Sequence, residues 1–182
     1  MKDTYFYLPE SKSNRLVKVT YKDADNNLVD HEGVDNPYNF PLQKNSSYFS
    51  AIGGLVSTTH DYALFLQCIL RGGKTETGKS IIGKQIIDSL LTNQLGEKTF
   101  IFGGQKSLNN FGLGVGLTTK AGRIINNASE GSFFWGGAFN TAYMVDPKRN
   151  VITLFFFQRT PFVLPPLLSK LEKLTIDIID KK

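Results

Sequence analysis

The segment Gly131–Thr141 contains the residues whose types and spacing are most suited to chemistry. It reads Gly-Ser-Phe-Phe-Trp-Gly-Gly-Ala-Phe-Asn-Thr, and its Trp-Gly-Gly triplet leads directly into a strand-like run. Glycines on a strand beside a cleft let a substrate lie against bare backbone, and a free N–H there can face a developing oxyanion. The alternative is purely structural, a tight bend beside a core tryptophan, and both interpretations stay open on these residues alone.

A second segment, Gly73–Ser80, matches the phosphate-loop pattern of nucleotide-binding proteins letter for letter. Such a loop must follow a buried strand, so that its N–H groups and the next helix N-terminus converge on the phosphates. The preceding residues, Tyr62–Arg71, instead have helical periodicity, and Gly72-Gly73 is typical of a helix end. Asp146, which would have to hold magnesium, precedes a proline in a turn. We therefore predict a surface connection between two helices that binds no phosphate.

Other common site patterns fail on their context. Phe111–Gly116 has alternating glycines, but the helix that a dinucleotide fingerprint requires does not follow it. The two histidines, His31 and His60, lack ligand-like spacing, and the single cysteine, Cys68, lies in an apolar helical stretch. No Gly-x-Ser-x-Gly elbow is present, which excludes the usual α/β-hydrolase pattern. We predict neither a metal nor a cofactor.

Four stretches of the chain resemble the serine β-lactamase and penicillin-binding-protein family, in its class C and esterase-like branch. They occur in the family's order and at about its spacing, and they cover nearly the whole chain: Met1–Thr4, Gly53–Thr58 with Asp61–Ala63, Asn93–Leu95 with Phe111–Gly114, and Trp135–Ala138 running into Val145–Pro147. The resemblance implies an α+β fold, the carboxy-terminal portion of the β-lactamase/transpeptidase-like fold, with an antiparallel sheet flanked by helices.

The resemblance also assigns roles to the Trp-Gly-Gly triplet, which is similar to the Lys-Thr-Gly strand motif of β-lactamases. Trp135, Gly136 and Gly137 would line the substrate cleft, and the N–H of Ala138 would be one oxyanion donor. Tryptophan in place of lysine removes a cation that binds the carboxylate of a β-lactam, which disfavours antibiotic hydrolysis.

The family's nucleophile lies in a Ser-x-x-Lys motif, in which the lysine assists deprotonation of the serine, helped by Tyr-x-Asn or Ser-x-Asn. No Ser-x-x-Lys occurs here: Ser80 and Lys84 are one residue too far apart, and Ser107–Asn109 lies far from the family's position for its second motif. In the family, both motifs precede the stretch that Met1–Thr4 resembles. We therefore expect no catalytic residue within this chain, and we expect Met1 to be an internal methionine of a longer protein.

Two function classes follow. The parent protein would transfer an acyl group through a serine ester, as an esterase, a peptidase acting on D-amino-acid peptides or a β-lactamase, with a small acyl or peptide substrate. The rival is a non-catalytic binding module that keeps the cleft without the chemistry. A simple nucleotide binder ranks behind both, for the reasons given for Gly73–Ser80.

Length and composition indicate a globular chain. It has 182 residues, of which 41% are hydrophobic, and a net charge of +5. Basic residues alternate with acids, as in Lys22-Asp23, which indicates a solvated surface and not a nucleic-acid site. No segment reaches the roughly 18 apolar residues of a membrane span, and the compartment stays open. We interpret 1–182 as a single incomplete domain, helical and loop-rich over about 1–105, with the sheet and a closing helix over about 106–182.

Periodicity and turn residues predict the elements. We expect strands at Leu16–Tyr21, Phe111–Thr118 and Arg123–Asn127, and a hairpin of Thr141–Val145 and Val151–Gln158 across Asp146–Asn150. A first helix should run from Ser57–Thr59 to Gly72, and a second should begin at Ser80 with its inward residues at Ile82, Ile86, Leu90 and Leu91. A last helix should begin at Pro165, with an apolar face made of Leu167, Leu171, Leu174 and Ile178. Trp135–Ala138 should lie on the strand beside this hairpin.

The apolar run Val151–Phe157 carries an expectation about partners. In the family, early strands of the whole protein complete the later ones, so without them this run risks exposure at a sheet edge. We expect the surface next to the Trp135 strand to be covered by a missing amino-terminal half or by a homo-oligomer.

Overall fold

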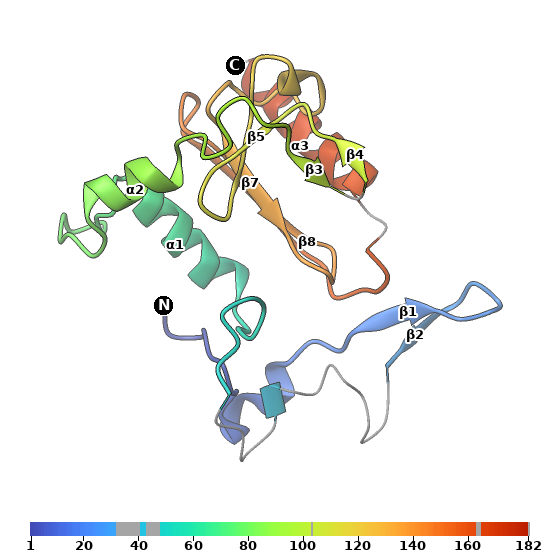
Figure 1. Cartoon of the computed structure of the whole chain (residues 1–182). Coiled ribbons are helices and arrows are strands. Elements are labelled where there is room, and N and C mark those ends of the chain that lie inside the picture. Colours follow the sequence, from blue (N-terminus) through green and yellow to red (C-terminus); the bar gives the residue numbers. More distant parts are fainter. Residues whose placement is uncertain (32–40, 43–47, 103, 163–164, 182) are drawn as a thin grey trace.

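The computed structural model describes residues 1–31, 41–42, 48–102, 104–162 and 165–181. Figure 1 shows the chain coloured along its sequence. At the centre of the structure is a five-stranded antiparallel sheet in the order β5-β6-β7-β8-β9, in which each strand pairs with its neighbours in the chain. The strands are β5 (Asn110–Phe111), β6 (Gly116–Leu117), β7 (Phe133–Gly136), β8 (Thr141–Asp146) and β9 (Val151–Phe156). This architecture confirms the predicted α+β fold with an antiparallel sheet flanked by helices.

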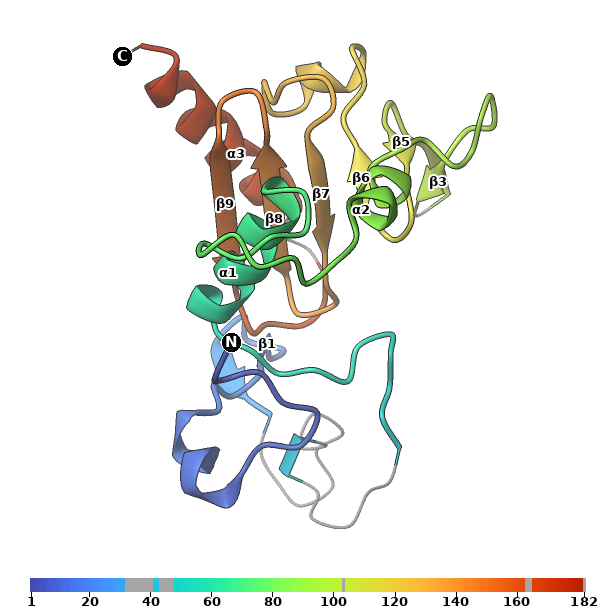
Figure 2. The same ribbon diagram turned by 90° about the vertical axis from the view of Figure 1, so that its left-hand side faces the viewer.

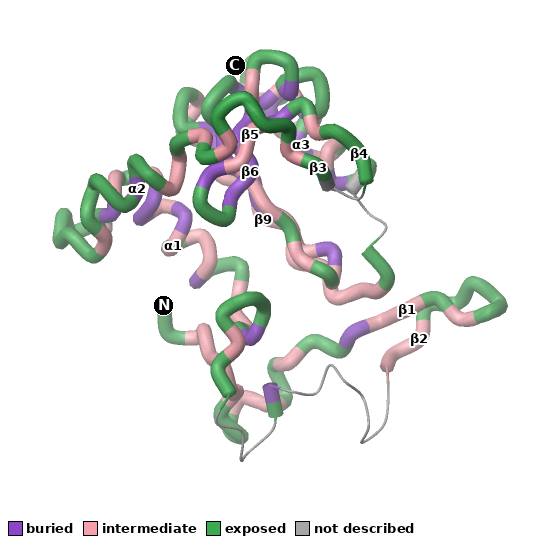
Figure 3. Tube along the Cα trace, in the orientation of Figure 1, coloured by how far each residue is buried: buried purple, intermediate pink, exposed green. Residues whose placement is uncertain are grey.

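Two helices cover opposite faces of the sheet (Figure 2), α1 (Thr59–Leu70) on one and α3 (Pro165–Ile179) on the other. Alternate residues of β8 point to opposite faces, as the pleat requires. Tyr143 and Val145 therefore join the core beneath α1, whereas Met144 packs with Ile176 of α3. The buried residues follow these two contacts, and the amino-terminal region is mostly exposed or intermediate (Figure 3).

Helix α1 has the predicted limits. The Thr58 hydroxyl accepts a hydrogen bond of 3.2 Å from the Asp61 amide, which satisfies one of the free N–H groups of the first turn. At the other end Gly72 and Gly73 have positive φ angles of 65° and 88°, and the Gly73 amide donates to the Cys68 carbonyl. The segment that resembles a phosphate loop therefore follows a helix, as predicted.

The β8–β9 hairpin is also confirmed, and a buried carboxylate anchors its turn. Asp146 is fully buried, and its Oδ1 accepts hydrogen bonds of 3.1 Å from the amides of Lys148 and Arg149. The Arg149 guanidinium donates to Asp146 Oδ2 at 2.8 Å and forms a two-pronged ion pair with Asp180, just past α3, at 2.7 Å. Burial alone would raise the pKa of Asp146, but hydrogen bonds from the Ser129 amide and from Arg149 outweigh it and lower the pKa. Arg149 thus ties the hairpin to the closing helix.

Substituting Arg149→Ala should destabilise the protein by about 3 kcal/mol or more, because it leaves the Asp146 carboxylate buried without its cationic partner. Urea denaturation measures this change. Lys148→Ala is the matched control, since Lys148 is exposed and only its backbone amide contacts Asp146. Equal losses in the two variants would contradict the role of the guanidinium.

The orientation of α3 corrects the sequence prediction. Leu168, Glu172 and Ile176 face the sheet and are buried, whereas Leu167, Leu174 and Ile178, which belong to the predicted apolar face, are 43%, 48% and 59% exposed. The physical reason is a polar contact: the Glu172 carboxylate accepts a 2.7 Å hydrogen bond from the Asn126 amide, and this pair makes a charged residue compatible with the interior. The apolar residues Leu167, Leu174 and Ile178, with the partly exposed Leu171, form a stripe on the outer side of α3, hereafter the α3 stripe.

Burial raises the pKa of Glu172 from its usual value of 4.5, although the hydrogen bond from Asn126 partly opposes the shift. Because the pKa of Glu172 is higher in the folded than in the unfolded protein, its contribution to the free energy of unfolding is fully present below the unfolded pKa. That contribution is lost as the pH rises through the folded pKa. Glu172→Gln should therefore match the parent in acid and become more stable than the parent at neutral pH, by on the order of 1 kcal/mol. Urea denaturation at several pH values tests this, with exposed Glu130→Gln as the control. A pH-independent difference would refute the assignment.

Three further element predictions are wrong in their details. Helix α2 (Lys84–Leu90) begins four residues after Ser80, with Gly83 as its N-cap, so Ile87 is buried and Ile86 is 61% exposed. The predicted strand Phe111–Thr118 is β5 and β6 joined by a tight turn. Arg123–Asn127 is not a strand, because Gly122–Ile124 forms a 3-10 helix and Asn127 has a φ of 59°.

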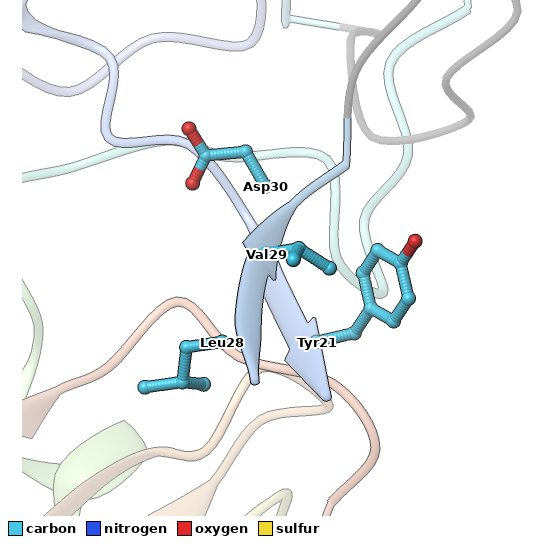
Figure 4. Close-up of a pocket in the computed structure, with 4 residues that line it drawn as sticks. All are labelled: Tyr21, Leu28, Val29 and Asp30. Atoms are coloured by element: carbon cyan, nitrogen blue, oxygen red, sulfur yellow. The ribbon is translucent and has the colours of Figure 1, made fainter. Parts of the chain in front are cut away.

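The amino-terminal region contains a 3-10 helix, η1 (Glu10–Arg15), and a hairpin of β1 (Thr20–Lys22) and β2 (Leu28–Asp30). The hairpin shortens the predicted strand and attaches to the segment after β9: the Thr20 amide donates to the Gln158 carbonyl, and the Thr160 amide donates to the Thr20 carbonyl, both at 2.8 Å. An open hollow of about 600 Å³ is lined by Tyr21, Leu28, Val29 and Asp30 of this hairpin (Figure 4).

A second small hairpin consists of β3 (Ile101–Phe102) and β4 (Gln105–Lys106). Within the described ranges, no helix has both the length and the apolar character needed to cross a membrane.

Candidate functional site

The Trp-Gly-Gly triplet lies at the end of β7, between β6 and β8. Trp135 pairs with Tyr143, and Gly136 pairs with Ala142. The strand ends there, so Gly137 and Ala138 lie in the turn beyond it and not on the strand as predicted. This turn leads into β8, so β7 lies beside the β8–β9 hairpin, as predicted.

The turn Gly137–Asn140 is held in a defined conformation. The Asn140 amide donates to the Gly137 carbonyl at 3.0 Å, and the Gly137 amide donates to the Thr141 carbonyl at 2.8 Å. Asn140 has a φ of 62°, a left-handed conformation that asparagine tolerates better than most residues. Its buried side-chain amide donates to the carbonyls of Arg159 at 2.7 Å and Pro161 at 3.0 Å, which ties the turn to the segment after β9.

One backbone donor in this turn is available. The Gly137 amide is used within the hairpin, whereas the Ala138 amide has no hydrogen-bond acceptor among the described residues, and Ala138 is exposed. A Cβ at position 137 would lie 2.5 Å from the Thr141 hydroxyl oxygen, so a side chain there would force the Thr141 side chain to move. A fixed, exposed N–H beside bare backbone is the arrangement that can stabilise an oxyanion.

Trp135 lies at the centre of an aromatic group that the sequence reasoning did not identify. Its ring packs edge-on against Phe111 at a centroid distance of 5.0 Å, and Phe100 lies 6.1 Å from Trp135. Phe100 and Phe111 stack on each other at 4.8 Å with an interplanar angle of 17°. A signal for Phe100 existed in the sequence, since an apolar run followed by Gly103-Gly104 is typical of a hairpin.

The other predicted features also have clear positions. Gly73–Ser80 connects α1 to α2, and its Thr75 and Gly78 amides donate to carbonyls of the same loop, so they do not converge on an anion. Within the described segments, no cluster of three or more His, Cys, Asp or Glu side chains could hold a metal. The absence of phosphate binding stays a prediction, as do the roles of Trp135, Gly136, Gly137 and Ala138.

The family model for Beta-lactamase matches residues 1–171. The chain belongs to the beta-lactamase family. Two curated relatives come from Mycobacterium tuberculosis strains, Uncharacterized protein MT1414 and Protein Rv1367c. Each is 26% identical over 168 residues, which cover 88% of this chain and 40% of the relative.

Solved structures show the same fold. A mutant of the simvastatin synthase LovD from Aspergillus terreus superposes with a TM-score of 0.74 at 20% identity, covering 100% of this chain and 47% of LovD. EstCE1, a hydrolase with promiscuous acyltransferase activity, gives 0.71 at 17% identity, covering 95% of this chain and 46% of its own. A penicillin-binding protein homolog from Caulobacter crescentus gives 0.62 at 15% identity, with coverages of 96% and 48%. The chain therefore spans less than half the length of the beta-lactamase-like proteins that it matches.

Proposed function

We propose that this chain forms the oxyanion-binding, sheet-bearing part of a serine acyl hydrolase or acyltransferase, whose serine and lysine lie on a further segment of the same fold. The observation that carries the proposal is the exposed Ala138 amide, held in a rigid turn directly after Gly136-Gly137. An acyl transfer through a serine ester develops negative charge on the carbonyl oxygen, and a preorganised N–H stabilises that charge.

The further segment would complete the sheet at β9. Within the described part of the chain, β9 is the edge of the sheet and no strand pairs with its outer side. On the neighbouring helix α3, the α3 stripe is a second apolar surface that is open to solvent. The neighbouring structures are about twice as long as the part that matches this chain, which supports an amino-terminal part of the fold as the occupant of both surfaces.

This location refines the sequence expectation, which put the uncovered surface next to the Trp135 strand. The open edge is β9, two strands away from β7 in the sheet. The faces of β9 are contacted by α1 and α3, so the surface that a partner would complete is the strand edge together with the α3 stripe. Covering of these surfaces stays a proposal.

The rival function is a binding module with the same fold but without the chemistry. The reading frame immediately upstream of Met1 separates the two. An in-frame Ser-x-x-Lys supports the enzyme, because the family's nucleophile and its lysine would then be present. Its absence supports the module.

The decisive variant is Ala138→Pro, introduced into the protein translated from the extended reading frame. Ala138 is the second residue of its turn, a position that proline favours, so the turn is retained while the N–H is removed. Losing one oxyanion donor should lower kcat by about 100- to 1,000-fold. The measurement is turnover of p-nitrophenyl esters, with Ala138→Ser, which keeps its N–H, as the control. Equal turnover in the two variants would remove Ala138 from the mechanism.

A further inference from the structure

We infer that the rings of Phe100, Phe111 and Trp135, hereafter the aromatic wall, bind the apolar acyl group of the substrate. The inference rests on the proposed acyl-transfer function and names its substrate class: esters or thioesters of neutral, hydrocarbon-rich acids. The wall joins three segments far apart in the sequence, namely the loop before β3, strand β5 and strand β7.

Trp135 packs against the core beneath α1, but the three rings of the wall are less deeply buried than that core. Phe133, two residues before Trp135 on β7, is fully buried, whereas all three rings of the wall are only partly buried. The next apolar residues along the chain are open to solvent as well, with Ile101 60% exposed and Leu113 54% exposed. Partly exposed apolar surface of this kind, next to the turn Gly137–Asn140, is typical of a ligand-binding surface.

The position of the wall suits an acyl group. Trp135 precedes Ala138 by three residues, a separation that even an extended chain limits to about 11 Å. A carbonyl oxygen at the Ala138 amide would therefore leave the acyl chain within reach of the Trp135 ring and of the Phe111 ring packed against it. Aromatic rings offer dispersion contacts and large apolar area, and they cannot pair with a carboxylate. The wall thus selects neutral hydrocarbon groups.

The single tryptophan of the chain makes this inference directly measurable, since all indole fluorescence comes from Trp135. The 182-residue chain is titrated with N-methyloctanamide and with N-methylacetamide, two unreactive neutral amides that differ in the length of the acyl chain. We expect a saturable change in Trp135 emission with the longer amide only. Phe100→Ala and Phe111→Ala should each weaken its binding about five- to tenfold through loss of ring contacts.

Controls separate local from global effects. Phe162→Leu alters a ring that is 40% exposed outside the wall and should bind as the parent does. Phe100→Leu and Phe111→Leu replace the alanine variants if these do not fold, as judged by circular dichroism, and should weaken binding in the same direction. Binding that ignores acyl length, or that is unchanged in the wall variants, would overturn the inference. The titration needs no nucleophile, so its failure is distinct from failure of the proposed acyl transfer, which is read from turnover.

Discussion

Mixed with p-nitrophenyl butanoate or a chromogenic cephalosporin, the 182-residue chain alone is expected to give only background hydrolysis. Turnover should lie on the order of a million-fold below that of the protein completed by a Ser-x-x-Lys segment, because removing the nucleophile of a serine hydrolase has an effect of this size. The described contacts agree with this expectation. In the described part of the chain, no hydrogen bond joins a serine hydroxyl to a lysine amine, and the fully buried Ser132 hydroxyl has no partner.

Two measurements test this prediction: the initial rate of hydrolysis and the mass of the intact protein after incubation with the substrate. The chain alone should show no acyl adduct, whereas the completed protein should show one adduct, on the serine of its Ser-x-x-Lys motif. A stoichiometric adduct on any serine of residues 1–182 would place the nucleophile within this chain and would show that the candidate site is wrongly located.

The second large effect is self-association of the isolated chain. Sedimentation equilibrium over a concentration series should give an average mass that rises above the 20.3 kDa of the monomer. The reason is the open edge of β9 together with the α3 stripe, whose Leu167, Leu174 and Ile178 are 43%, 48% and 59% exposed. Because each of these side chains is about half exposed, burying it contributes about 1 kcal/mol, so the stripe adds a few kcal/mol to the association.

A charge substitution in the stripe tests which surface associates. Leu174→Glu combined with Ile178→Lys removes two apolar residues and creates a Glu–Lys pair four residues apart, which supports the helix. This variant should lower the average mass towards that of the monomer. Ile86→Lys is the control, because Ile86 is 61% exposed on α2, outside the stripe. A parent chain that stays monomeric throughout, or a control variant with the same effect, would show that the stripe is not an interface.

The features predictable from the sequence were those with local causes. The β8–β9 hairpin follows from alternating apolar residues on both sides of Asp146–Asn150, and the limits of α1 follow from Thr58 and Gly72-Gly73. The Trp-Gly-Gly triplet predicted the strand of the candidate site, although β7 ends at Gly136 and leaves Gly137 in the turn.

The features that were missed depend on contacts between distant residues. Glu172 is buried because Asn126, 46 residues away, donates to it, and this contact reverses the face of α3 that periodicity predicts. The aromatic wall likewise depends on three segments meeting in space. Helix α2 is a subtler case: it begins at Lys84, after the N-cap Gly83, instead of at Ser80, and it buries Ile87 and not Ile86.

The attachment of the β1–β2 hairpin has a consequence for the order in which the chain folds. Strands β5 to β9 pair with their neighbours along the chain, so the sheet assembles through small loops. Thr20, in contrast, bonds to Gln158 across a separation of 138 residues. Closing so long a loop costs more chain entropy than closing the short loops of the sheet, and during synthesis Gln158 leaves the ribosome long after Thr20. The hairpin is translated before the sheet but can dock only onto the finished end of β9, so it reaches these contacts after the sheet has formed.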